Sequence, residues 1–137
     1  VGTFFVVTEW LDNGQAGYLT WDQAREMAAA GMAIESHSRS HPDLTNDCDY
    51  DCRVYQVLGS VETIAAEIGV RPRFFCYPGG RYDAGLFAVL RAAGIVAAVT
   101  THGGTLHVSE RPLELPRVRV RGTTTLRDFA WMVGEWR

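Results

Sequence analysis

The sequence has no uninterrupted apolar run of the roughly 20 residues that a membrane-spanning helix requires, so no membrane span is expected. It has no block of basic residues, and its net charge is −3, which makes nucleic acid a poor candidate for a partner. Its three cysteines, Cys48, Cys52 and Cys76, cannot form a full disulfide framework. Neither repeats nor low-complexity segments divide the chain, and we therefore expect one domain over residues 1–137.

The printed sequence also lacks an initiator methionine and a signal-peptide pattern. It opens at Val1-Gly2-Thr3 directly into a β-branched and aromatic run, which is typical of a buried strand. A first strand that nothing holds tends to fray. We therefore expect further residues before Val1, and the residues themselves do not reveal a cellular location.

Strand and helix patterns alternate along the chain. Runs of β-branched and apolar residues predict strands over residues 3–7, 32–36, 73–77 and 95–100, with a further candidate over 115–120. The residues that cap the predicted helices are Thr20 (with Gln23 completing a capping box), Asp49 or Asp51, Asp83 and Thr125, and the first three helices stop at Gly31, Gly69 and Gly94. This β-α-β-α-β-α-β order predicts an α/β fold with a parallel sheet and crossover helices.

Two histidines four residues apart, His37 and His41, follow the predicted strand over 32–36. Imidazoles at this spacing can point at one position in space, which suits a divalent metal, with Zn²⁺ as the first candidate because it favours nitrogen ligands. The alternative is a surface or capping histidine pair. Cys48 and Cys52 have a similar spacing, but a polar helix start with incidental thiols is favoured there over a zinc knuckle.

Polar and glycine-rich segments gather where the predicted strands end. His37 and His41, residues 78–83 and residues 100–104 all follow carboxyl ends of strands. Parallel α/β proteins build their sites at that edge of the sheet. This shared location predicts a functional site more strongly than any single motif.

Several segments resemble the polysaccharide deacetylases, carbohydrate esterase family 4. Residues 36–44 (Ser-His-Ser-Arg-Ser-His-Pro-Asp-Leu) resemble the family's His-x-x-x-His motif, and residues 74–83 (Phe-Phe-Cys-Tyr-Pro-Gly-Gly-Arg-Tyr-Asp) resemble its next motif. Shorter matches, in the right order, fall at residues 3–6, 19–23, 98–101 and 115–118. The resemblance therefore covers nearly the whole chain.

The resemblance implies an irregular (β/α) barrel of the polysaccharide deacetylase type, here without its N-terminal βα unit. It implies a hydrolase that removes acetyl groups from acetylated oligo- or polysaccharides by attack of metal-bound water. His37 and His41 would be two metal ligands, with Zn²⁺, Co²⁺ or Ni²⁺ as the cation. A secreted or cell-envelope location is also typical of the family.

The resemblance also assigns catalytic and substrate-binding residues. The backbone N–H of Gly79 would stabilise the oxyanion, and Arg117 would supply the positive charge that the family carries where Cys76 stands here. Arg117 has an equally good interpretation as a solvated strand residue, and Pro78-Gly79-Gly80 as a plain turn. The residues implied to bind substrate are Tyr77, Pro78, Gly80 and Tyr82.

Three features depart from the family's pattern. The family's Asp-Asp motif, which supplies the base and the third metal ligand, is absent and is expected before Val1. No histidine stands on the late strand, and His102 and His107 are interpreted as surface residues. The alternatives are therefore a non-catalytic carbohydrate- or metal-binding module derived from a deacetylase, or a homo-oligomer in which a second copy pairs with the open strand edge at 3–7.

Overall fold

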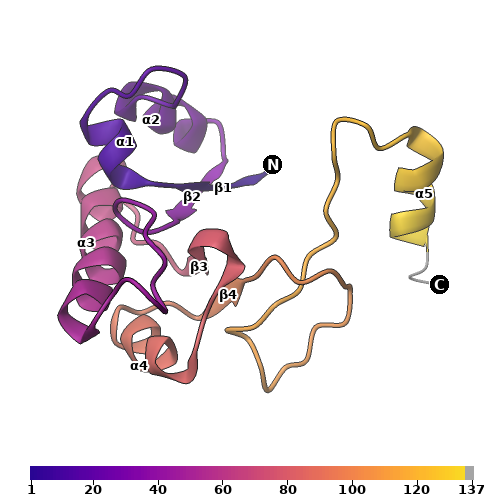
Figure 1. Cartoon of the computed structure of the whole chain (residues 1–137). Coiled ribbons are helices and arrows are strands. Elements are labelled where there is room, and N and C mark those ends of the chain that lie inside the picture. Colours follow the sequence, from indigo (N-terminus) through magenta and orange to yellow (C-terminus); the bar gives the residue numbers. More distant parts are fainter. Residues whose placement is uncertain (135–137) are drawn as a thin grey trace.

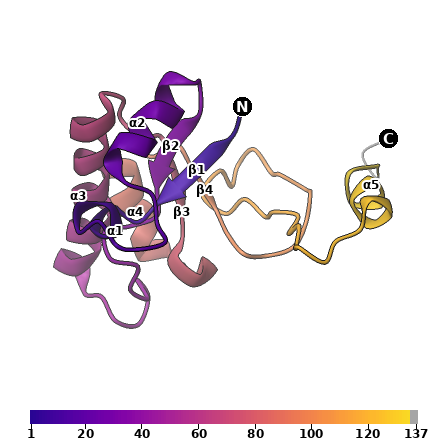
Figure 2. The same ribbon diagram turned by 90° about the horizontal axis from the view of Figure 1, so that it is seen from above.

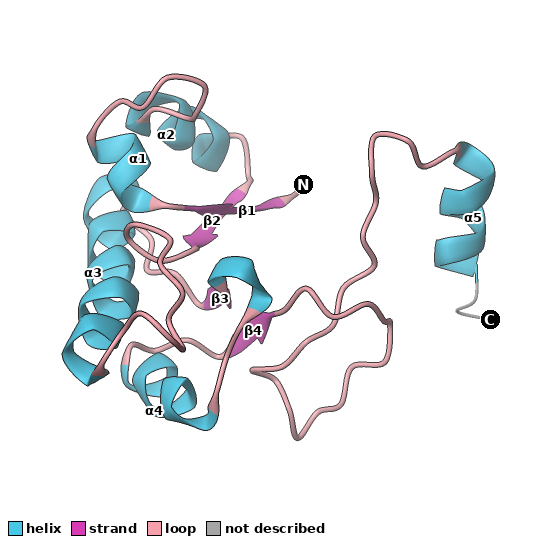
Figure 3. Ribbon diagram, in the orientation of Figure 1, coloured by secondary structure: helices cyan, strands magenta, loops and turns pink. Residues whose placement is uncertain are grey.

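A parallel four-stranded sheet forms the centre of the molecule. The computed structural model describes residues 1–134, and its strands are β1 (Thr3–Val6), β2 (Ala33–Ser36), β3 (Phe74–Cys76) and β4 (Ala97–Val99). They pair in the order β1-β2-β3-β4, and every pair is parallel (Figure 3). The predicted parallel sheet is confirmed, with each strand slightly shorter than its sequence pattern.

The helices begin and end at the residues that the sequence marked. Their bounds are α2 (Trp21–Ala29), α3 (Tyr50–Ile68), α4 (Ala84–Ala92) and α5 (Leu126–Gly134). The Thr20 hydroxyl accepts from the Gln23 amide while the Gln23 side chain accepts from the Thr20 amide, so the predicted capping box is present. Asp49 and Asp83 accept from backbone amides at the starts of α3 and α4, and Gly69 ends α3 in the left-handed region (φ 80°).

Two short elements lie next to the carboxyl edge of the sheet. The helix α1 (Thr8–Asp12) directly follows β1, and a 3-10 turn, η1 (Pro78–Gly80), follows β3. The sequence pattern does not predict α1, because five residues are too short to show a helical period. Both elements help to shape the predicted site.

Two apolar clusters hold the helices against the sheet. Helices α1 to α4 lie together on one side of the sheet, whereas the chain after β4 leaves on the other side (Figures 1 and 2). The larger cluster joins α3, α4 and β3 through Val57, Val61, Phe75, Leu86 and Leu90, among others. The smaller one joins β1, α1, α2, β2 and α3 through Val6, Leu11, Ala24, Ile34 and Ile64. The sheet that positions the site is therefore well packed on its helical face.

The strand expected over residues 115–120 is wrong. Leu115 makes one parallel bridge to Val99, and the chain then continues without a strand partner to α5. We call residues 116–134 the arm; both views show it standing apart from the helices around the sheet (Figures 1 and 2). An alternating pattern forms a strand only where a neighbouring strand accepts its hydrogen bonds.

Two of the three cysteines differ from what the sequence predicted. Cys48 and Cys52 form a disulfide, so their interpretation as incidental thiols is wrong, and Cys76 is free and buried.

Among the described residues, none of the helices combines the length and the apolar character needed to cross a membrane.

Candidate functional site

His37 is held rigidly at the end of β2. Its backbone N–H donates to the Val6 carbonyl at 2.9 Å, and its ring Nδ1 lies 2.6 Å from the Cys76 carbonyl oxygen on the neighbouring strand β3. Burial lowers the pKa of His37, and the charge of Arg117 adds to this shift, whereas the Cys76 carbonyl opposes it. A neutral ring that uses Nδ1 for a backbone carbonyl leaves Nε2 for another partner, which is the usual arrangement of a metal-binding histidine.

The loop after β2 brings His41 to His37. The two ring centroids are 4.8 Å apart, and the rings meet edge to face at 82°. Ser38 and His41 both have positive φ angles, of 69° and 64°, which is a costly conformation for residues other than glycine. The buried Ser38 hydroxyl accepts from the His41 amide at 3.0 Å and helps to hold this turn.

Helix α1 supports the same loop from outside. The amides of Thr8 and Glu9 donate to the carbonyls of Ser38 and Arg39 at 3.3 and 2.9 Å. The ring of Trp10 stacks on the ring of His41, with centroids 5.8 Å apart and planes 25° apart. Helix α1, which the sequence pattern does not predict, therefore helps to fix the loop that carries both histidines.

Gln56 of α3 supports the loop from the other side. Its side-chain carbonyl accepts from the amides of Arg39 and Ser40 at 3.1 and 3.0 Å, and its amide nitrogen donates to the Ser40 hydroxyl. Gln56 is buried. A buried glutamine must find hydrogen-bond partners, but its burial arises from the fold, so the sequence alone carries no signal for this role.

The histidine pair has the donor chemistry of a divalent-metal site but supplies two ligands. Imidazole nitrogens suit Zn²⁺, Co²⁺ and Ni²⁺. Within residues 1–134, no group of three or more His, Cys, Asp or Glu side chains could together hold a metal ion. The pair therefore fits a metal centre that needs at least one further ligand.

Arg117 lies beside the histidine pair. Its Nε donates to the Thr100 carbonyl at 2.9 Å, and its Nη2 lies 3.5 Å from the Cys76 thiol. Cys76 is also the residue whose carbonyl holds His37, and burial raises the pKa of its thiol. Arg117 thus places a positive charge next to the Cys76 thiol. Its side chain is exposed, and its predicted catalytic role remains a prediction.

The turn after β3 is mostly structural. Tyr77 is 1% exposed, and its hydroxyl donates to the Leu113 carbonyl at 2.9 Å. Pro78 is fully buried. At Gly80 (φ 74°) an added Cβ would stand 2.0 Å from the Thr101 hydroxyl oxygen. Tyr77, Pro78 and Gly80 are therefore buried residues that shape the turn, and their predicted substrate contacts remain predictions.

Two residues of this turn remain accessible. Gly79 is exposed, with φ at 61°, a conformation that suits glycine. Tyr82 is partly buried and stacks on Tyr77 with ring centroids 5.0 Å apart. His102 meets the Tyr82 ring at 5.9 Å. Gly79 and Tyr82 are thus placed where a ligand could reach them, and their predicted roles remain predictions.

The other histidines and the tryptophans differ in their exposure. His102 and His107 are exposed, as expected. Trp10 and Trp21 are partly buried, whereas Trp131 on α5 is 66% exposed. Trp136 lies outside the described residues.

Comparison with known proteins gives consistent matches. Residues 1–98 match the family model described as polysaccharide deacetylase. Over 107 residues the chain is 29% identical to YxkH of Bacillus subtilis (strain 168), a polysaccharide deacetylase by name, and this match covers 78% of the chain and 38% of YxkH.

Solved structures of similar fold agree with these sequence matches. The deacetylase PplD of Streptococcus pyogenes, solved in complex with acetate, matches with a TM-score of 0.89 and 25% identity, covering 95% of this chain and 57% of PplD. A polysaccharide deacetylase from Bacillus cereus matches with a TM-score of 0.83 and 25% identity, covering 95% of this chain and 40% of that protein. The chain therefore spans roughly 40 to 60% of the length of these relatives.

Proposed function

The chain belongs to the polysaccharide deacetylase family, and from that premise we propose that it contributes to a metal-dependent hydrolase that removes acetyl groups from acetylated sugars or polysaccharides. Its fold is the α/β, irregular barrel type of that family. The observation that carries the proposal is the pair of imidazoles, His37 and His41, which face each other across 4.8 Å at the carboxyl edge of the sheet.

His37 and His41 would hold the cation, with Zn²⁺ favoured and Co²⁺ or Ni²⁺ as alternatives. When bound, such an ion supplies Lewis acidity at the acetyl carbonyl and lowers the pKa of a water molecule. The hydrogen bond from the His37 ring to the Cys76 carbonyl fixes which ring nitrogen is free. The stack of Trp10 on His41 fixes the plane of the second ring.

The other residues would bind and orient the acetylated sugar. The exposed Gly79 offers its backbone N–H to the developing oxyanion, and the absence of a side chain there lets a sugar approach closely. The Nε of Arg117 donates a hydrogen bond to the Thr100 carbonyl, and this contact holds a positive charge at the carboxyl edge of the sheet. That charge would orient an anionic partner such as a carboxylate or the oxyanion.

The test compares the full-length gene product with its His37→Ala/His41→Ala double variant. Metal content after dialysis against Zn²⁺, Co²⁺ or Ni²⁺ is measured together with acetate release from acetylated chito-oligosaccharide and acetylated xylan. A His102→Ala/His107→Ala variant is the matched control, because it removes two exposed histidines outside the pair. Loss of bound metal and of acetate release in the first variant alone supports the proposal, and equal values in both variants refute it.

A non-catalytic binding module is the second candidate. It is favoured by one observation: within the described residues no third ligand joins the two histidines, and two ligands do not complete a zinc site. Metal and oligosaccharide binding without acetate release would assign the chain to this class.

A further inference from the structure

The arm carries three arginines close together in its extended segment. Arg117, Arg119 and Arg121 alternate there with Val118 and Val120. Arg119 and Arg121 are exposed, and among residues 1–134 neither forms an ion pair.

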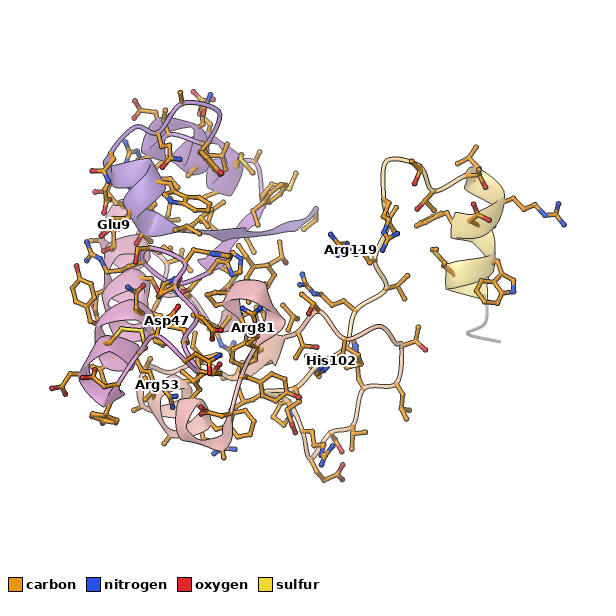
Figure 4. All side chains as sticks on the ribbon, in the orientation of Figure 1. Glu9, Asp47, Arg53, Arg81, His102 and Arg119 are labelled. Carbon is orange, nitrogen blue, oxygen red and sulfur yellow. A yellow bond between two sulfur atoms is a disulfide. The ribbon has the colours of Figure 1, made fainter. Side chains whose placement is uncertain are left out.

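The charge of the molecule is unevenly distributed. Residues 111–127 hold five arginines and one glutamate, a net charge of +4, so the rest of the chain has a net charge of −7. Figure 4 shows Arg119 on the extended part of the arm, between the sheet and α5. A short positive segment on an otherwise acidic molecule attracts a small or locally charged anion, whereas the remaining negative charge opposes a long polyanion such as nucleic acid.

Three hollows lie along these arginines, and two of them share Arg117, Val118 and Arg119. The first of these two, of about 350 Å³, is also lined by Thr100, Thr101 and Val120. The second, of about 230 Å³, extends from the loop after β4 to Trp131 and Met132 of α5. We call these two hollows together the arginine groove.

The groove combines the groups that recognise an acidic sugar chain. Trp131 presents an exposed ring, and a flat apolar ring with a polar edge can pack against the C–H face of a sugar. The guanidinium groups of Arg117 and Arg119 can pair with a carboxylate or phosphate. Gly103, whose position has no atom within 4 Å of an added Cβ, leaves room for the ligand.

The groove begins at the candidate site itself. Arg117 lines both hollows and also lies 3.5 Å from the thiol of Cys76, the residue that holds His37. A chain lying in the groove would therefore have one end beside the histidine pair. We propose that the arginine groove binds the acidic part of a glycan, so that the substrate class is a polysaccharide carrying negatively charged groups near its acetylated sugars.

This inference rests on the proposed function, since it takes the ligand to be a glycan, but its test requires neither metal nor hydrolysis. Calorimetry compares a hexasaccharide of alternating glucuronic acid and N-acetylglucosamine with a neutral N-acetylglucosamine hexasaccharide. The acidic hexasaccharide is expected to bind more tightly at low salt and to lose this advantage as salt is raised. Equal affinity for the two probes at low salt would overturn the inference.

Two variants of the arm locate the binding, each with a matched control. Arg119→Gln should weaken the acidic probe about three- to fivefold, as expected for an exposed ion pair, and leave the neutral probe unchanged. Arg127→Gln removes the same charge from α5 but lies outside both hollows. Trp131→Ala should weaken both probes by up to about tenfold through the lost ring contact, whereas Leu126→Ala, which removes another exposed side chain of α5, should not.

The controls also separate the two proposals. An equal loss in Arg119→Gln and Arg127→Gln, or equally tight binding of a twelve-nucleotide single-stranded DNA, would contradict the groove. Normal binding of the acidic glycan by a protein that releases no acetate would support the groove and reject the hydrolase. Acetate release with no preference for the acidic probe would support the hydrolase and contradict the groove.

Discussion

At the scale of single residues, the orientation of His41 depends on Trp10. His37 has a backbone carbonyl to fix its ring, whereas the ring of His41 is packed between Trp10 and the edge of His37. Trp10→Leu is therefore expected to weaken Ni²⁺ or Co²⁺ binding about three- to tenfold, the usual value of an aromatic contact. Titration followed by metal absorbance measures the change.

Trp131→Leu is the matched control for this prediction, because Trp131 lies on α5 and is largely exposed. Its metal affinity should equal that of the unaltered chain. If Trp10→Leu binds metal as tightly as the control, the stack does not position His41. If both variants are weakened alike, general destabilisation is the cause.

Glu35 should make stability depend on pH. Its carboxylate accepts from the amides of Arg73 and Phe74, both at 2.8 Å, and burial raises its pKa although these two bonds oppose the shift. A carboxyl whose pKa is higher in the folded state stabilises the fold most below its unfolded pKa. That contribution is lost as the pH rises through the folded pKa.

Comparison with Glu35→Gln isolates this effect, because the amide keeps an acceptor and does not titrate. The unfolding free energy of the unaltered chain minus that of Glu35→Gln should fall as the pH rises above the ordinary glutamate pKa. Urea unfolding at a series of pH values measures the difference. A difference that grows over that range would show that the two amide bonds dominate over burial.

At the scale of elements, Asp83 joins two helices. It caps α4 by accepting from the Leu86 amide, and its carboxylate accepts from Nη1 and Nη2 of Arg53 on α3 at 3.0 and 2.8 Å. Asp83→Ala should cost about 1–2 kcal/mol of unfolding free energy, mostly for the lost cap. Urea denaturation measures the change.

The control for this prediction is Asp128→Ala at the start of α5. Asp128 accepts from the amide and hydroxyl of Thr125, but its helix stands apart from the sheet and its other helices (Figure 2). The change should leave the global unfolding free energy within about 0.5 kcal/mol of the original, as for other surface substitutions. An Asp83→Ala effect no larger than this would refute the capping argument.

The elements show how far the sequence could predict the structure. Caps and stops such as Thr20, Asp83 and Gly69 depend on neighbouring residues, so the sequence located them correctly. The strand over residues 115–120 failed because its pairing depends on a distant partner. The disulfide between Cys48 and Cys52 was not predicted, because it depends on how the fold brings the two thiols together and not on their spacing alone.

The residues of the candidate site were likewise predictable where they are close in the sequence, and not where only the fold brings them together. His37 and His41 could be proposed together because one short loop carries both. The approach of Arg117 to Cys76 joins residues 41 positions apart, and only the folded sheet creates it. Tyr77 was assigned to substrate by its motif, but its burial against Leu113 depends on tertiary packing that the motif does not contain.

At the scale of the whole molecule, the chain consists of a packed part and an exposed arm. The buried apolar clusters lie between residues 6 and 113. On α5, in contrast, Leu126 is 87% exposed and Trp131 is 66% exposed. Burial of apolar surface is the main source of stability, so the arm should contribute little to the folding of the rest.

Deleting residues 123–137 tests this division. The deletion should leave the unfolding midpoint within about 2 °C, since less than about 0.5 kcal/mol is removed. It should preserve metal binding by His37 and His41, because neither histidine contacts α5. It should also weaken binding of the acidic hexasaccharide, because Trp131 lines the arginine groove. Differential scanning calorimetry and titration measure these quantities, and a large fall in the midpoint would show that the arm stabilises the fold.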